Sequence, residues 1–320
     1  MNKNILIFIF FIMIQNFAFA ETIYVSNEKD HNITVIDGNS LEVIKTVKVG
    51  HRPRGIILSK DKKKIIICTS DDNRITVVDV ESLEIDYYLP SGPDPELMVM
   101  DDNGKLIFVA NEDDNMVTVV DYEKKEIVKE IPVGVEPEGM GLSPDGKTLV
   151  NTSETTNMAH FIDTQTLEIK ANILVDARPR VAQFTKDGNF VWVSSEIGGT
   201  ISIIDPKKFE IIKKIEFKIP GLSKESIQPV GIRLDNKRQL AYVALGPANR
   251  VAIINMKTFE VEKYILTGQR VWNLIINSNG TRLYTTNGVS NDISVIDIEK
   301  RKVIKSIPVG RYPWGVVVKE

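Results

Sequence analysis

Charged and aromatic side chains recur on either side of regularly spaced prolines, and their types are suited to binding an anion. Arginine pairs with carboxylates through two parallel hydrogen bonds, and flat aromatic faces suit a planar molecule. The residues of this set are Arg52, Arg54, Arg178, Arg180, Arg270, Trp272 and Trp314. They predict a polar pocket for a planar anion, such as a carboxylated quinone or an acidic metabolite.

Acidic side chains accompany the arginines and leave a structural interpretation equally open. The acids beside the prolines are Asp94, Glu96, Glu136 and Glu138. A second position of the same pattern carries Glu28, Asp71, Glu112, Glu154 and Glu196, and then Gly246 and Gly288. Acids and arginines could form a ring of ion pairs that only holds the fold in register. The two glycines predict open space beside the tryptophans, so we expect a ligand on that side.

An internal repeat of 42 residues positions these side chains. Its marker is the loop G-x-x-P-x-G, whose proline recurs at Pro53, Pro95, Pro137, Pro179, Pro229 and Pro313, with Val271 in its place once. Neighbouring markers lie 42 residues apart except for one step of 50, which predicts an extra loop over residues 218–225. Repeats of this length are typical of propeller blades and solenoid units.

Each repeat has the pattern of four short β-strands. In the third repeat we expect strands over residues 139–142, 147–151, 159–163 and 168–174. Alternating and β-branched apolar residues mark the strands, and Gly, Pro, Asn and Asp mark the turns. No stretch carries a sustained helical period, so we expect little helix.

Two series of turn residues are assigned to the backbone rather than to a ligand. The first ends the third strand and is expected to accept N–H groups of the next turn. It comprises Asp37, Asp79, Asp121, Asp163, Asp205, Asn255 and Asp297. The second follows the second strand and is expected to adopt a positive φ. It comprises His31, Asn73, Asn115, Asn157, Gly199, Asn249 and Asn291.

The two ends of the chain predict how the repeats close. The first repeat begins at its second strand, over residues 22–25, and the last repeat ends after its first strand, over residues 311–318. Joined, they complete one more four-stranded unit. We therefore predict an all-β fold: a seven-bladed β-propeller with four antiparallel strands per blade, closed by the C-terminal strand joining the N-terminal strands. The charged loops then crowd one end of the central channel, here called the channel mouth.

The repeat resembles a known type. Its motifs are Pro-x-Gly, Ser-Pro-Asp-Gly-Lys at 143–147, Val-Thr-Val-Val-Asp at 117–121 and Ile-Pro-Val-Gly at 131–134. They resemble the YVTN-type β-propeller repeat over the whole mature chain. Among seven-bladed members, the chain looks most like periplasmic propellers associated with PQQ-dependent alcohol catabolism. The resemblance implies PQQ as the candidate cofactor, and a quinoprotein dehydrogenase or a transporter component as the candidate partner.

Residues 1–20 have the pattern of a cleaved secretory signal peptide. Lys3 precedes an apolar run over residues 5–14, and Ala18-Phe19-Ala20 forms a cleavage site. An uncleaved membrane anchor is the rival interpretation, but the run is short for a membrane span. We expect a soluble periplasmic protein with one domain over residues 21–320 and no later membrane span. Its single cysteine, Cys68, is expected to be a small buried side chain.

Composition and motifs disfavour several functions. A net charge of −3 argues against broad nucleic-acid binding. The three histidines, His31, His51 and His160, share no spacing for a metal site, and only His51 is placed at the channel mouth. The acid-rich turns at 71–73 and 112–115 lack the spacing of a calcium loop. No G-x-S-x-G, P-loop or dinucleotide motif occurs in the mature chain.

These observations favour a monomeric binding or accessory protein over an enzyme. A lactonase-like hydrolase remains the first alternative, because related propellers include lactonase-like proteins and the channel mouth carries Arg, Glu and His51. A purely structural scaffold for a periplasmic complex is the second. Propellers that bind haem d1 are similar in repeat type, but they tend toward eight blades and need histidine ligands.

Overall fold

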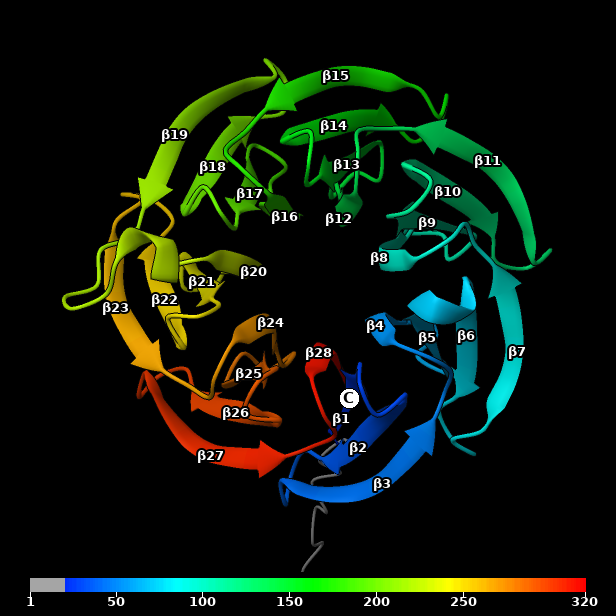
Figure 1. Ribbon diagram of the computed structural model, residues 1–320, viewed down its shortest axis with the longest axis horizontal. Helices are drawn as coiled ribbons and strands as arrows, with labels where there is room; N and C mark the ends of the chain where they lie inside the picture. Colours follow the sequence, from blue (N-terminus) through cyan, green and yellow to red (C-terminus); the bar gives the residue numbers. More distant parts are fainter. Residues whose placement is uncertain (1–20) are drawn as a thin grey trace, which may run out of the picture.

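The structure, a computed structural model, describes residues 21–320, which form one ring of seven four-stranded blades (Figure 1). The predicted seven-bladed β-propeller is therefore confirmed. The expected signal peptide at residues 1–20 lies outside the described residues. Helix is limited, among the described residues, to the 3-10 turns η1 (Ser70–Asp72) and η2 (Lys224–Ser226). Within residues 21–320, no helix has the length and hydropathy that crossing a membrane requires.

The blades are numbered in chain order, and each runs from the innermost strand to the outermost. Blade 1 contains β4 (Pro53–Leu58), β5 (Lys64–Thr69), β6 (Arg74–Asp79) and β7 (Ile85–Pro90). Blade 2 contains β8 (Pro95–Met100), β9 (Leu106–Asn111), β10 (Met116–Asp121) and β11 (Glu126–Pro132). Blade 3 contains β12 (Pro137–Leu142), β13 (Thr148–Ser153), β14 (Met158–Asp163) and β15 (Ile169–Leu174).

The remaining blades follow the same plan. Blade 4 contains β16 (Pro179–Phe184), β17 (Val191–Ser195), β18 (Thr200–Asp205) and β19 (Glu210–Glu216). Blade 5 contains β20 (Pro229–Asp235), β21 (Leu240–Leu245), β22 (Arg250–Asn255) and β23 (Val261–Leu266). Blade 6 contains β24 (Val271–Ile276), β25 (Arg282–Asn287), β26 (Asp292–Asp297) and β27 (Lys302–Pro308). Blade 7 contains β28 (Pro313–Lys319), β1 (Thr22–Asn27), β2 (Asn32–Asp37) and β3 (Glu42–Lys48).

Blade packing explains the apolar runs in the second and third strands. Each of these strands is covered on both faces, because neighbouring blades stack against it. Ile65, Ile66 and Ile67 of β5 are fully buried, and Ile65 and Ile67 pack with Tyr24 of blade 7 in one core cluster. The outermost strands lie at the periphery of the ring, and most of their residues are exposed to solvent. The core is thus a series of layers between blades, which leaves the channel to the innermost strands.

Blade 7 is built from both ends of the described chain, as the sequence predicts. Strand β28 pairs antiparallel with β1, with Tyr24 opposite Val317 and Val25 opposite Val316. The red β28 lies beside the blue β1 at the seam of the ring (Figure 1). Because β28 pairs with β1, strand β1 has no unpaired edge at the seam.

The predicted turn chemistry is confirmed. Asp163 Oδ1 accepts the N–H groups of Gln165 at 2.7 Å and Thr166 at 3.0 Å, and the same bonds recur at the other blades. All seven residues of the second turn series have a positive φ, from Asn73 at 52° to Gly199 at 68°. The extra loop connects β19 to β20 and contains η2.

Candidate functional site

Hydrogen bonds between blades hold the residue that precedes the marker position in six of the seven blades. The N–H of Asp94 donates to Asn73 Oδ1 at 3.0 Å, and the N–H of Arg178 donates to Asn157 Oδ1, also at 3.0 Å. Four more blades repeat the bond, with His31 Nδ1 as the acceptor for Arg52. The residues so held have φ between 49° and 59°, which is uncommon for residues other than glycine. The second turn series therefore positions the backbone from which the charged side chains at the channel mouth extend.

The residue that follows each marker position forms an inner ring at the channel mouth. The charged and aromatic members are Arg54, Glu96, Glu138, Arg180, Trp272 and Trp314. Glu96, Glu138, Arg180 and Trp314 are buried. Buried charges require close partners, because burial removes their hydration. The ring supplies those partners in two clusters on different sides of the channel.

The first cluster joins blades 7, 1 and 2. Arg52 lies 2.8 Å from an Asp94 oxygen and 3.3 Å from Glu96 Oε1, while Arg54 forms an ion pair with Glu96 and lies 3.7 Å from Glu28. Burial raises the pKa of the Glu96 carboxyl well above its usual range, and the Arg54 guanidinium opposes that shift. Burial lowers the pKa of Arg54, but Glu96 and Glu138 outweigh it, so the pKa of Arg54 is raised overall.

The second cluster joins blades 3, 4 and 6. Arg180 lies 2.9 Å from Glu138 Oε1 and forms an ion pair with Glu154. Arg178 Nε lies 2.8 Å from Glu154 Oε2, and Arg270 lies 2.7 Å from Glu196 Oε1. The predicted ring of ion pairs is therefore present, and each arginine at the channel mouth has a carboxylate partner.

Glu154 should make the stability of the protein depend on pH. Burial raises the pKa of Glu154 to about 8, with Arg180 opposing the shift and Glu138 adding to it. Between about pH 4.5 and 8 the folded protein then binds a proton that the unfolded chain releases, so stability falls as the pH rises. We expect a loss of about 2–4 kcal/mol over this window in thermal unfolding. The variant Glu154→Gln should flatten this slope, whereas the exposed Glu130→Gln should leave it; equal slopes in all three proteins would contradict the assignment.

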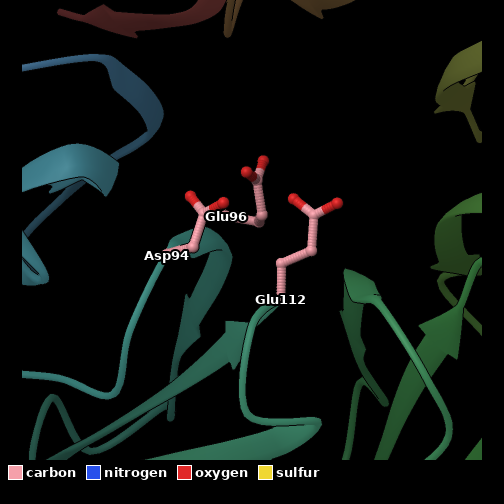
Figure 2. Close-up of side chains that lie close together, drawn as sticks. All are labelled: Asp94, Glu96 and Glu112. Atoms are coloured by element: carbon pink, nitrogen blue, oxygen red, sulfur yellow. The ribbon is translucent and has the colours of Figure 1, made fainter.

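Three carboxyl groups could approach a cation. Asp94, Glu96 and Glu112 each offer one oxygen, and these oxygens lie within 4.8 Å of one another. Figure 2 shows their carboxyl groups side by side, from the loop before β8, from β8 itself and from the loop after β9. Oxygen ligands of this kind suit a hard cation such as Ca²⁺. Arg52 already pairs with Asp94 and Glu96, so ion pairs account for two of the three carboxyl groups, and burial raises the pKa of the third, Glu112.

The prediction of open space beside the tryptophans is wrong, because other side chains occupy that space. A Cβ placed on Gly288 would lie 2.4 Å from Trp272 Nε1, and one placed on Gly246 would lie 3.7 Å from the Arg270 guanidinium carbon. The glycines therefore make room for Trp272 and Arg270. Trp314 is only 2% exposed, so its face is not a free wall, whereas Trp272 is half-buried. The Arg270 guanidinium lies 4.3 Å from the centre of the Trp272 ring.

The histidines and the cysteine lie outside this cluster of ion pairs. His51 is exposed at the rim, with Nδ1 2.7 Å from Asp72. The expectation that only His51 lies at the channel mouth is wrong, since the ring of His31 lies 5.0 Å from that of His51. His160 is buried and accepts the N–H of Gly134 through Nε2, and burial lowers its pKa. Cys68 is fully buried, as predicted, and burial raises the pKa of its thiol.

Fold and site together define a class, that of seven-bladed β-propellers with a charged channel mouth. The chain belongs to the family described as a domain of unknown function, DUF5074, whose model matches residues 12–184. No curated protein sequence matches it.

Solved structures show the same fold at low sequence identity. The chain is similar to hydrazine synthase of Kuenenia stuttgartiensis, with a TM-score of 0.78, 22% identity, and coverage of 86% of this chain and 92% of that one. It is similar to a functionally unknown protein of Desulfotomaculum acetoxidans, with a TM-score of 0.77, 14% identity, and coverage of 93% and 98%. A third match is the dihydro-haem d1 dehydrogenase NirN in complex with DHE, with a TM-score of 0.70, 16% identity, and coverage of 92% and 74%. At these identities the similarity describes the fold alone.

Proposed function

We propose that this propeller is a binding or accessory protein that receives a planar anionic ligand at the channel mouth, beside Arg270 and Trp272. The electrostatics of Arg270 carry the proposal. Burial lowers the pKa of Arg270, Glu196 opposes this shift only in part, and Arg180 and Arg178 add to it. An incoming carboxylate would therefore stabilise this guanidinium.

Geometry supports the same side of the channel mouth. Arg270 and Trp272 are both half-buried, so each keeps one side toward solvent. Gln228 Oε1 accepts a hydrogen bond from Arg270 at 3.1 Å and holds the guanidinium against the indole. Arg178, at 46% exposed, lies beside the same carboxylate, Glu196. A planar carboxylate could stack on the indole and pair with either arginine.

The biological setting is proposed from the sequence. The YVTN-type repeat and the signal-like residues 1–20 support a periplasmic protein linked to PQQ-dependent catabolism, with PQQ as the first ligand to test. A quinoprotein dehydrogenase or a transporter component is the partner to test. Protein recovered from periplasm should begin at Glu21 when its mass is measured; a mass that includes residues 1–20 would contradict cleavage.

A thermal-shift titration of residues 21–320 tests ligand binding. PQQ, or a small planar carboxylate in its place, should raise the melting temperature in a concentration-dependent manner. The variant Arg270→Gln should reduce the apparent affinity about tenfold or more, because it removes a charged hydrogen bond. Arg301→Gln is the matched control, since Arg301 pairs with Glu262 outside the channel mouth.

Three other results would contradict the proposed binding site or favour an alternative function. Equal shifts in the Arg270→Gln variant and the unaltered protein would contradict binding at this side. Lactone hydrolysis that EDTA abolishes would favour the hydrolase alternative. A periplasmic partner captured by both proteins without any ligand would favour the scaffold alternative.

A further inference from the structure

A cavity lies in the channel, at the end opposite to the channel mouth. Its volume is about 510 Å³, and its walls come from the innermost strands of blades 1–6. Its rim includes Lys60 and Asp102, which stand in the turns between first and second strands and lie 3.1 Å apart. In a blade, those turns are at the opposite end from the channel mouth. This channel cavity, as it is called below, is of a size that suits a small ligand.

One position of the repeat sets the character of the channel cavity. The fourth residue after each marker position is Ile57, Val99, Gly141, Gln183, Arg233, Ile275 or Val317. In five blades this position holds an apolar residue or glycine. The residues of blades 1–5 at this position line the cavity, namely Ile57, Val99, Gly141, Gln183 and Arg233. Arg233 and Gln183 are the exceptions. Polar groups in such a wall are costly unless they find a partner.

Arg233 lacks the partner that every arginine at the channel mouth has. Within residues 21–320 Arg233 forms no ion pair with a carboxylate, and its side chain donates to the carbonyl oxygen of Ile232 at 2.7 Å. Burial lowers the pKa of Arg233 to about 10, and no neighbouring acid opposes the shift. The guanidinium remains charged at neutral pH. A cation in this position is electrostatically complementary to an anion.

Gln183 adds a second polar group without a partner. Its Oε1 is buried and makes no hydrogen bond among the described residues. Asn273, which also lines the channel cavity, is already used, since its Nδ2 donates to the Trp314 carbonyl at 3.0 Å. A buried polar atom of this kind is normally satisfied by a water or a ligand.

Apolar side chains form much of the remaining wall. Met98, Met100, Met140 and Phe184 line the channel cavity together with aliphatic side chains. Methionine side chains adjust to irregular shapes and contact both aliphatic and aromatic groups. We propose that the channel cavity binds a small organic carboxylate, whose charged end pairs with Arg233 and whose apolar body packs among these side chains.

This site goes beyond the proposed function, because it uses different residues at the other end of the channel. In their strands, Arg54, Glu96, Glu138 and Arg180 stand three residues before the cavity-lining positions, on the side of the channel mouth. A ligand of the channel cavity would enter past Lys60 and Asp102. The two sites can therefore be tested separately in one protein.

Calorimetric titration of residues 21–320 with octanoate tests the proposal. Octanoate should bind with one site per chain. The affinity for octanol should be at least about tenfold lower. Arg233→Met should weaken octanoate binding about tenfold or more and leave octanol unchanged. Arg301→Met, which alters an arginine outside the channel, and Arg270→Gln, which alters the channel mouth, should both bind octanoate as the unaltered protein does.

A second measurement locates the ligand and reports on folding. The ¹³C-methyl signals of Met98, Met100 and Met140 should shift on adding octanoate, whereas that of Met256, which does not line the channel cavity, should not. Arg233→Met should melt within a few degrees of the unaltered protein, because Arg233 is only partly buried and forms no ion pair among the described residues. Should that variant fail to fold, Gln183→Met replaces it, with a smaller loss of octanoate affinity expected.

Three results would overturn the proposal. One is equal affinity for octanoate and octanol, since the charge would then contribute nothing. Another is unchanged octanoate binding in Arg233→Met. The third is inorganic phosphate binding as tightly as octanoate, which would leave no role for the apolar wall.

Discussion

A chain that ends at Arg311 is expected to lose its cooperative unfolding transition. The deletion removes β28, so β1 loses its partner and the ring opens. It also removes Trp314 and Val316 from the core and leaves Ser26 Oγ without the Gly315 N–H that it accepts at 2.9 Å. The expected loss exceeds the usual total stability of about 5–15 kcal/mol for a native domain. Circular dichroism during heating measures it.

Adding the missing strand back provides the control for this truncation. A synthetic peptide of residues 311–320 should restore part of the transition in a concentration-dependent manner, because it can pair with β1. A peptide with the same composition in scrambled order should not. A truncated chain that still melts cooperatively within a few degrees of the complete one would contradict the closure argument.

The variant Arg180→Met is expected to be the most destabilising single change at the channel mouth. Its guanidinium is buried and contacts Glu138, Glu154 and, at 3.7 Å, Glu196. Removing it leaves three buried carboxylates with less compensation, which costs about 3–5 kcal/mol. For a chain of this size the melting temperature should fall by about 6–15 °C. Differential scanning calorimetry at pH 9, above the pKa of Glu154, measures the difference.

A matched arginine and a second substitution make the interpretation specific. Arg178→Met should cost about 1 kcal/mol or less, because Arg178 is half exposed and its ion pairs are screened. Adding Glu154→Gln to Arg180→Met should recover part of the loss, since the pair is coupled. Equal losses in Arg178→Met and Arg180→Met would show that burial of the charge does not matter.

Most of the fold could be predicted from the sequence because the information is periodic. A marker every 42 residues fixes the number of blades, and the unequal ends fix the composite blade. The strand bounds in the third repeat differ from the prediction by one or two residues. Pro137 belongs to β12, for example, although the pattern starts the strand at Gly139. A proline fits there because it is the first residue of a strand.

The site could be predicted only in outline. The sequence indicates which residues reach the channel mouth, but not how far a side chain reaches into the next blade. Trp272 fills the space at Gly288, and Arg270 fills that at Gly246, so two small residues predict a gap that does not exist. Packing between repeats is not periodic, because each neighbour differs.

Two features had a signal in the sequence that was missed. Each turn residue such as Asn73 stands 21 residues before the residue whose N–H it accepts, and this spacing recurs in six blades. A constant spacing of that kind indicates a contact. Arg233 and Gln183 likewise interrupt a position that is otherwise apolar or glycine.

The pairing of β28 with β1 also bears on when the protein can fold. Tyr24 and its partner Val317 are separated by nearly the whole described chain, so this contact cannot form before Val317 has been synthesised. Blades 1–6 hold all four of their strands within one continuous stretch and can assemble earlier. Closure of blade 7 therefore needs two strands that are far apart in the chain, and until they pair β1 has an open edge that a foreign strand could occupy.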